Sequence, residues 1–498
     1  MTARQDSDGL AWDRSDELYE EAQKQVRFSS TCRKIESFAG KIFERPVTFV
    51  PPLIIGGFNV LYPIQIEGVP ANVLVRLPLP NQALFPEEKT VAEAATAAYI
   101  RHHTQVPVPK VFNYGLDAEV GPFMIIQDLG TRRDLADVLS APREDSDEVP
   151  VLRLDIAENK LKGMYGKVAR LLLQLAQAAL PRIGAIVETG PGSFDVTARP
   201  MTLNFFNMAQ LSNIPKSIFP PKGATYQTAD EWYTLLAEMQ MATLLFQHND
   251  IVTSEDDCRT KYVARQLFRR LAKRGQLSSF GFSAEDTWSA YRKNRPTTPR
   301  LPKPDGSASF RLWSDDFRPV NILVDEDDNI VGAIDWEFAY AAPTQFALDP
   351  PWWLLLEVPE MWEGGIDAWT SEYERRLPTW LSAMEEAEQD IAPGSFLLSA
   401  YMRESWETGR FWLNYAARKS WAFDTVFWKY LDERFFGERD KDIPAQELWK
   451  TRVQLLSQDE RAAMEPFVHI KMEESKERVL VEWGDAEARE RLSSFLFE

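Results

Sequence analysis

One run organises this sequence: Leu312-Trp313-Ser314-Asp315-Asp316-Phe317-Arg318-Pro319-Val320-Asn321-Ile322-Leu323-Val324-Asp325. An acidic turn to Asn329 follows, and a second apolar run then leads through Ile334 to Asp335. Two short apolar runs joined by a polar turn predict a β-hairpin. Because a hairpin returns the chain to its start, we expect the side chains of Asp316, Asn321 and Asp335 to converge on one point.

Three oxygen-bearing side chains suit a hard cation, since Mg²⁺ is usually held by one or two carboxylates together with substrate phosphates. In phosphoryl-transfer enzymes one Asp receives the proton of the acceptor hydroxyl, and an Asn and a second Asp bind the metal that bridges the phosphates. Asp316, Asn321 and Asp335 have this order and spacing. The pattern therefore predicts phosphoryl transfer.

These residues resemble the aminoglycoside phosphotransferase and choline kinase type of kinase-like enzymes, whose motif reads H-x-D-x-x-x-x-N followed by I-D-W-E. The second part stands here as Ile334-Asp335-Trp336-Glu337. The catalytic run and the later segment Pro350-Pro351-Trp352-Trp353-Leu354-Leu355-Leu356-Glu357 are similar to a group of filamentous-fungal phosphotransferase-domain proteins. The resemblance implies an α+β, bilobal protein kinase-like fold with an N-terminal β-rich lobe and an enlarged, mostly helical C-terminal lobe.

Two positions of the motif leave alternatives open. The family's His falls on Ser314. Because that His mainly supports the loop and is not the proton acceptor, its loss weakens the prediction of catalysis without removing it. The alternative is a nucleotide-binding pseudokinase that acts as a scaffold. Arg318 stands where protein kinases place a Lys, and a fixed cation there would neutralise charge on the transferring phosphoryl group. Alternatively, Arg318 is a surface residue that pairs with Asp315 or Asp325.

The segment from Val47 to Leu129 contains apolar runs separated by turns, which predicts the nucleotide-binding lobe. Glycines allow backbone amides to approach a phosphate closely, so the turn after Ile55 is predicted to cover the phosphates. An ordinary hairpin turn is the alternative. The residues of this covering turn are Gly56, Gly57, Phe58 and Asn59.

Arg76 interrupts the apolar run Val73 to Leu77, in the order in which kinase folds place the Lys that pairs with the phosphates. We expect Arg76 to grip the phosphates; the alternative is an edge-strand Arg that faces solvent. Glu93, on a helix predicted from Lys89 to His102, is its candidate ion-pair partner. The main chain predicted to read the adenine edge is that of Gln127, Asp128 and Leu129.

The composition, with 498 residues, 44 % hydrophobic and 26 % charged, is that of an ordinary globular protein. A net charge of -19 argues against nucleic acid and anionic membrane partners, which need a basic surface, and mildly favours a cationic or neutral acceptor. Two cysteines and four histidines, none at zinc-ligand spacing, argue against a zinc site or disulfide framework. We find no apolar leader and no run of membrane-spanning length, so we expect a cytoplasmic protein.

The second lobe is predicted to contain a core helix from Ile156 to Leu180, two inserted helices at about 230–248 and 255–274, and a Pro-rich linker from Asn294 to Ser309. No A-P-E segment follows Asp335, which counts against a protein kinase. The last helices are rich in aromatic residues that form either core or the walls of an acceptor pocket. These are Trp406, Phe411, Trp412, Tyr415, Trp421, Phe423, Phe427 and Trp428, with Glu404, Glu407 and Asp424 among them.

These interpretations divide the chain into an N-terminal extension with a covering helix (1–45), a nucleotide-binding lobe (46–130), a catalytic lobe with a helical insertion (131–360) and a C-terminal helical substrate subdomain (361–498). Residues 1 to about 15 are expected to be disordered, and Glu17 to Phe38 helical. The predicted reaction transfers the γ-phosphoryl group of ATP to a hydroxyl of a small metabolite, with Asp316 as the base and Mg²⁺ held by Asn321 and Asp335. The sequence leaves the acceptor and the oligomeric state open.

Overall fold

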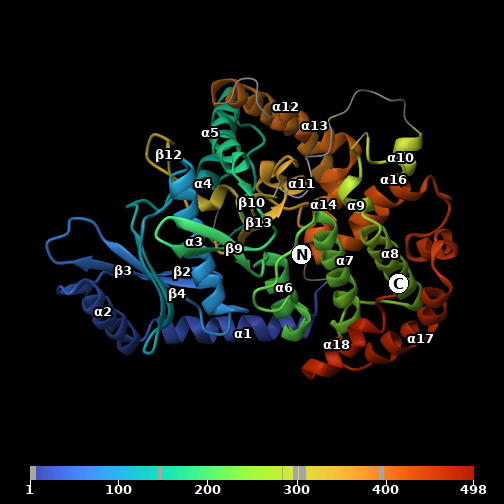
Figure 1. Ribbon diagram of the computed structural model, residues 1–498, viewed down its shortest axis with the longest axis horizontal. Helices are drawn as coiled ribbons and strands as arrows, with labels where there is room; N and C mark the ends of the chain where they lie inside the picture. The colour runs from blue at the N-terminus through green and yellow to red at the C-terminus, as the bar shows by residue number, and fades with distance from the viewer. Residues whose placement is uncertain are drawn as a thin grey trace.

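A computed structural model describes residues 7–143, 148–282, 284–294, 301, 310–391 and 397–497. Figure 1 shows a β-rich lobe at one end of the molecule and a larger helical lobe at the other, with β10 and β13 between them. This arrangement confirms the predicted α+β fold. The predicted linker from Asn294 to Ser309 lies outside the described residues except at Asn294 and Leu301. No helix in the described ranges is long and apolar enough to cross a membrane.

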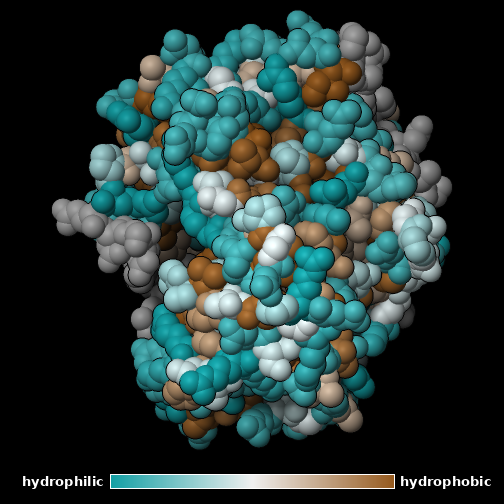
Figure 2. Space-filling view, turned by 90° about the vertical axis from the view of Figure 1, so that its left-hand side faces the viewer, coloured by the Kyte–Doolittle hydropathy of each residue, from teal (hydrophilic) through white to brown (hydrophobic). Residues whose placement is uncertain are grey.

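The β-rich lobe is an antiparallel sheet with the strand order β1-β3-β4-β6-β5 and with β2 beside β3. Figure 2 views this end of the molecule, where the surface is mostly hydrophilic and hydrophobic residues gather in the upper half. The strands are β1 (Val47–Phe49), β2 (Ile54–Ile55), β3 (Asn59–Ile66), β4 (Val73–Pro78), β5 (Val111–Asp117) and β6 (Gly121–Gln127).

The two faces of β4 have different neighbours, because successive side chains of a strand point to opposite sides. Val73, Val75 and Leu77 share a core with the N-terminal helices. Leu74 instead packs with α3 (Pro86–His103), and Arg76 lines the cleft between the lobes. The alternation along this strand therefore places Arg76 on the side where the catalytic hairpin lies.

The N-terminal segment forms two helices, α1 (Gly9–Val26) and α2 (Ser29–Phe43), where the sequence predicted disorder to about residue 15 and one helix after it. Figure 1 shows α1 passing beneath both lobes. Its start is held by Asp8, whose carboxylate accepts hydrogen bonds from the amides of Leu10 (3.0 Å) and Ala11 (3.1 Å). An N-cap of this kind satisfies amides that have no partner within the helix.

Substitution of Asp8 by Ala should lower the free energy of unfolding by about 1–3 kcal/mol. The carboxylate is fully buried and also accepts from the side-chain amide of Asn249 at 2.8 Å, so its removal leaves a helix start and a distant amide unsatisfied. Urea denaturation measures the change. Asp16→Ala, on the exposed side of α1, is the matched control, and an equal loss in both variants would contradict the capping role.

The helical lobe is built around α5 and α12, which pack against each other, and around the pair α7 and α8. Its helices are α4 (Leu135–Leu139), α5 (Glu158–Gln177), α6 (Leu203–Leu211), α7 (Ala229–Phe246), α8 (Glu255–Lys273), α9 (Gln276–Ser279), α10 (Ala290–Lys293), α11 (Thr344–Ala347), α12 (Gly365–Ile391), α13 (Leu398–Thr408), α14 (Arg410–Arg418), α15 (Phe423–Val426), α16 (Asp432–Phe436), α17 (Gln458–Glu474) and α18 (Asp485–Ser493). Short 3₁₀-helical segments are η1 (Lys216–Ile218), η2 (Pro319–Asn321), η3 (Trp352–Leu355), η4 (Ser420–Ala422), η6 (Ala445–Thr451) and η7 (Val453–Leu455), and η5 (Phe427–Leu431) is a π-helical segment.

The predicted core helix ends earlier than expected. Helix α5 stops at Gln177, and the next residues form β7 (Ala179–Leu180), in which Leu180 pairs with Phe310 of β10. The two inserted helices are confirmed as α7 and α8. The remaining strands are β8 (Ala185–Gly190), β9 (Ser193–Ala198), β10 (Phe310–Ser314), β11 (Ile322–Val324), β12 (Ile330–Ala333) and β13 (Ala339–Pro343).

The catalytic run folds as predicted, since β11 and β12 form an antiparallel hairpin in which Ile322 pairs with Ala333. Strand β10, which precedes the hairpin, pairs with β13, which follows it. The loop after β10 and the residues after β12 are therefore held side by side by two separate ladders. This double support is what brings the two ends of the predicted motif together.

Candidate active site

The ends of the hairpin bring Asp316, Asn321 and Asp335 together, as predicted. The amide of Ile334 donates to the carbonyl of Asn321 at 2.9 Å, which ties the residue before Asp335 to the catalytic loop. The Asn321 side-chain amide donates to Asp316 Oδ2 at 3.0 Å and to the Asp316 carbonyl at 2.8 Å. Asp335 itself has a φ of 64°, a conformation that non-glycine residues rarely adopt and that clusters at functional sites.

Arg318 pairs with the predicted catalytic base, at 2.7 Å between Arg318 Nε and Asp316 Oδ1. The predicted alternative, a pair with Asp315 or Asp325, is not what the structure has. Burial raises the pKa of Asp316 above its usual value, and the nearby charge of Arg318 offsets only part of this effect. A carboxylate with a raised pKa beside a fixed cation is suited to proton transfer.

Ser314, which replaces the family's His, supports the loop through its own hydroxyl. Ser314 Oγ accepts a hydrogen bond from the Asp316 amide at 3.3 Å. Beneath the loop, the buried Asp315 accepts from the indole N–H of Trp313 at 2.9 Å and lies 3.5 Å from the guanidinium of Arg418. Arg418, at the end of helix α14, was not recognised from the sequence, because its partner lies about a hundred positions earlier in the chain.

Arg76 forms the predicted ion pair with Glu93, at 3.1 Å, and also contacts Asp335 Oδ1 at 2.6 Å. It therefore joins β4, α3 and the catalytic hairpin. Burial by itself raises the pKa of Asp335, but the charge and hydrogen bond of Arg76 outweigh it and hold the pKa below the usual value. Asp335 thus stays ionised, which is the form that binds a cation.

Two charged residues that the sequence analysis missed complete this network. Lys89 and Glu337 form an ion pair, with side chains that are 0 % and 1 % exposed. Lys89 Nζ also donates to Asn59 Oδ1 at 2.8 Å, and the Asn59 amide donates to Glu337 at 3.0 Å. Burial raises the pKa of Glu337 to about 7, although the charge of Lys89 opposes the rise. Glu337 is the last residue of the I-D-W-E motif, the signal that pointed to it.

Only part of the turn that was predicted to cover the phosphates faces the cleft. Gly56 lines the cleft between the lobes. The Phe58 ring packs edge-on against Phe338, at 5.2 Å between centroids, and the Asn59 side chain is buried in the Lys89–Glu337 network. Both side chains therefore hold the turn against the helical lobe, because each finds its partners in the segment that follows Asp335. A Cβ added at Gly57 would meet no atom of the described residues within 4 Å.

The cleft is a cavity of about 260 Å³ with a polar end and an apolar end. Arg76, Glu93 and Asp335 lie at the polar end. Gln127 and Leu129 of the predicted adenine-binding segment line the cleft, whereas the Asp128 carboxylate pairs with Arg132 at 2.8 Å. The apolar wall consists of Ile54, Leu61, Leu74, Ala97, Val111, Met124, Ile126, Val320 and Leu323.

A second cavity, also of about 260 Å³, lies beside Asp316 and Arg318. We call it the Asp316 cavity. Its walls come from segments far apart in the chain: the start of α1, helix α6, the turn η3, the loop before α12 and the residues after α14. Its lining comprises Ser7, Trp12, Leu203, Asn207, Leu211, Asp315, Asp316, Arg318, Trp352, Val358, Glu360, Met361, Lys419 and Trp421.

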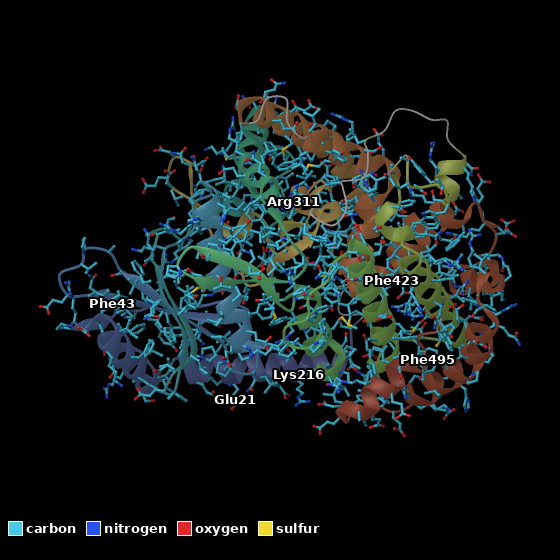
Figure 3. All side chains as sticks on the ribbon, in the orientation of Figure 1. Glu21, Phe43, Lys216, Arg311, Phe423 and Phe495 are labelled. Carbon is cyan, nitrogen blue, oxygen red and sulfur yellow. The ribbon has the colours of Figure 1, made fainter. Side chains whose placement is uncertain are left out.

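Most of the C-terminal aromatic residues form core. Phe423, labelled in Figure 3 among the helices of the large lobe, packs edge-on against Phe268 of α8 at 5.1 Å between centroids. Trp412 stacks on Tyr430 at 4.0 Å. Of the aromatic residues named above as candidate pocket walls, Trp421 is the one that lines the Asp316 cavity.

Residues 66–385 match the model of the phosphotransferase enzyme family. Similar solved structures include an ethanolamine kinase of Plasmodium vivax (13 % identity, TM-score 0.37, 91 % of this chain and 96 % of that chain covered) and a putative fructosamine-3-kinase from Haemophilus somnus (11 %, 0.35, 85 % and 97 %). A third is wild-type aminoglycoside 2'-phosphotransferase-IIIa in its GDP complex (12 %, 0.35, 88 % and 98 %). No curated protein matches significantly. Because the family match spans more than half of the sequence, the chain belongs to the phosphotransferase enzyme family.

Proposed function

We propose that this phosphotransferase moves the γ-phosphoryl group of ATP to a hydroxyl of a small metabolite. The observation that carries the proposal is the position of two carboxylates between two cavities: Asp335 lines the cleft between the lobes, and Asp316 lines the Asp316 cavity. Asn321 links the two ends through hydrogen bonds to Asp316 and to the Ile334 amide. A phosphoryl donor in one cavity and an acceptor in the other would meet at this hairpin.

The cleft suits a nucleotide because its two ends differ in chemistry. The apolar wall accommodates a flat base, and Gln127 and Leu129, two residues of the segment predicted to read the adenine edge, line the same cleft. At the other end, Arg76 is a permanently charged, planar donor of the kind that binds phosphate oxygens. Its pairing with Glu93 holds it in one orientation, so little conformational freedom is lost on binding.

The donor set also fits Mg²⁺. Asp335 is an ionised carboxylate and Asn321 supplies an amide oxygen, both of which Mg²⁺ accepts, and one or two protein ligands are usual when phosphates complete the shell. No group of three or more His, Cys, Asp or Glu side chains able to hold a metal occurs in the part of the chain that the structure describes, so the proposed site depends on the phosphates. When bound, the ion would neutralise charge on them.

In the proposed step, the acceptor oxygen attacks the γ-phosphorus, and the bond between that phosphorus and the bridging oxygen of ATP breaks, which leaves ADP. The hydroxyl proton passes to the Asp316 carboxylate, whose raised pKa favours this transfer. Asn321 orients Asp316 through its side-chain amide. Arg318, paired with Asp316, stands beside the site where negative charge is transferred.

Binding and turnover of MgATP test the proposal. We expect calorimetric titration of the full chain to show saturable MgATP binding that weakens when EDTA removes the metal, with slow ADP release in the absence of acceptor. Asp335→Ala should weaken MgATP binding about tenfold or more, since it removes both a metal ligand and an Arg76 partner. Asp327→Ala, in the exposed turn of the same hairpin, is the control that removes an equal charge.

The outcomes separate the phosphotransferase from the nucleotide-binding scaffold. Binding that is lost in Asp335→Ala but kept in Asp327→Ala, together with ADP release, supports the enzyme. Binding without any ADP release, even with a panel of alcohols, favours the scaffold. Absence of MgATP binding by the wild type refutes both functions.

A further inference from the structure

The Asp316 cavity contains a lysine whose charge the protein leaves unpaired. Lys419 follows α14 and is only 6 % exposed. Its Nζ lies 5.1 Å from the centroid of the Trp421 ring and 5.9 Å from that of Trp352, and all three residues line the cavity. Throughout the described ranges, no carboxylate forms an ion pair with Nζ and no acceptor receives a hydrogen bond from it.

Such a position is costly for an ammonium group, because taking a charge out of water without a partner loses its solvation. Burial lowers the pKa of Lys419, while the charges of Asp315 and Glu360 act in the opposite direction. The two indole faces recover part of the cost through cation-π attraction. They supply no acceptor for the three N–H donors of the ammonium, so its hydrogen-bonding capacity is directed at the cavity.

The carboxylates of the same cavity, in contrast, already have donors. Glu360 accepts from the Tyr415 hydroxyl at 2.7 Å and from the Trp421 indole N–H at 2.5 Å. Asp315 accepts from the Trp313 indole N–H at 2.9 Å. The third carboxylate, Asp316, pairs with Arg318 at 2.7 Å. Among the charged residues that line the cavity, Lys419 is therefore the one without a partner, and it is the group that needs a ligand.

We propose that the acceptor is a hydroxyl compound that also carries a carboxylate, which Lys419 binds while the apolar body of the acceptor lies against Trp352 and Trp421. This inference rests on the proposed phosphotransferase function and names its substrate class. The net charge of -19 mildly favours a cationic or neutral acceptor. A single desolvated cation at contact distance outweighs that diffuse field, which solvent ions screen over about 8–10 Å.

The test compares three ligands that share a hydroxymethylphenyl body and carry an anionic, a neutral or a cationic group opposite the hydroxymethyl. We would titrate the full-length protein with 4-(hydroxymethyl)benzoate, its neutral amide and the cationic 4-(hydroxymethyl)benzylamine, and follow tryptophan fluorescence, since three indoles, those of Trp12, Trp352 and Trp421, line the cavity. The benzoate should bind about tenfold or more tightly than either analogue, as a charge-assisted pair implies. Equal binding, a reversed order or no benzoate binding overturns the inference.

Variants of Lys419 assign the preference to this residue. Lys419→Met should weaken benzoate binding about tenfold or more and leave the amide within about threefold, whereas Lys419→Arg, which keeps the charge, should retain the preference. Lys222→Met, at an exposed position, is the matched control. Preference that survives in Lys419→Met places the anion elsewhere and overturns the inference. MgATP binding, measured on the same samples, reports separately on the proposed function: its absence from the wild type refutes that function whatever the benzoate does.

Discussion

Asp316→Asn is expected to lower the rate of phosphoryl transfer about 10²–10⁴-fold, the usual contribution of a positioned general base. The substitution preserves the size of the side chain and an oxygen that can accept from Asn321. It removes the group that takes the hydroxyl proton and the partner of Arg318. MgATP binding should change less than about threefold, because Asp316 lines the other cavity. ADP release and calorimetric titration measure the two effects.

The pH profile gives an independent check of the same role. Burial raises the pKa of Asp316, so the carboxylate becomes protonated, and unable to accept a proton, at a higher pH than an ordinary Asp. The wild-type rate should therefore fall as the pH decreases through this raised value, and Asp316→Asn should lack that dependence. Asp327→Asn, in the exposed turn, is the control for loss of one charge. Turnover by Asp316→Asn above about a tenth of the wild-type rate would exclude Asp316 as the base.

Lys89→Met is expected to lower the free energy of unfolding by about 3–5 kcal/mol, the usual cost of removing one member of a buried ion pair. Met has a similar length and no charge, so the variant leaves the buried Glu337 without its main cation and Asn59 without its donor. Urea denaturation measures the loss. Lys222→Met, at the surface, should change the free energy of unfolding by less than about 0.5 kcal/mol.

The loss in Lys89→Met should also depend on pH. The pKa of Glu337 is about 7 in the folded protein against a usual value of 4.5, so the folded state holds a proton that the unfolded chain has released. The contribution of Glu337 to stability therefore falls as the pH rises from about 4.5 to about 7. Without Lys89 the pKa of Glu337 rises further, so the variant should lose more stability at about pH 8 than at about pH 5.

A double variant separates the charge from the packing. Lys89→Met combined with Glu337→Gln removes both charges, and at about pH 8 it should recover a large part of the stability that Lys89→Met loses. Recovery identifies the unpaired carboxylate as the cause of the loss. Equal losses at both pH values and no recovery in the double variant would mean that Lys89 acts through packing alone.

The catalytic hairpin could be predicted from sequence because its information is local. Two apolar runs separated by an acidic turn specify the β11–β12 pairing, and the fixed side-chain alternation and return of the chain bring Asp316, Asn321 and Asp335 together. The pairing of Arg76 with Glu93 could also be predicted from the sequence. A strand and the helix that follows it lie close in the chain, and the family resemblance supplied their order.

Other features depended on partners that no local pattern indicates. Lys89 lies near the start of α3, and a lysine at such a position is usually exposed to solvent. Here it pairs with Glu337, 248 residues later. Asp8 starts a helix in a segment that resembles a disordered terminus, because Asn249 helps to hold it. Each case requires two distant segments to pack first, and only then does burial make the polar group need its partner.

By itself, the sequence determined the family, the α+β fold and the residues that converge at the hairpin, because residue spacing and strand geometry act over short distances. Only the tertiary structure decided which charges are buried and what surrounds the acceptor cavity. Five segments of the chain meet around Lys419, and its unpaired charge exists only once they pack together. The physical reason is that the cost of burying a charge is set by its three-dimensional neighbours, which spacing along the chain does not reveal.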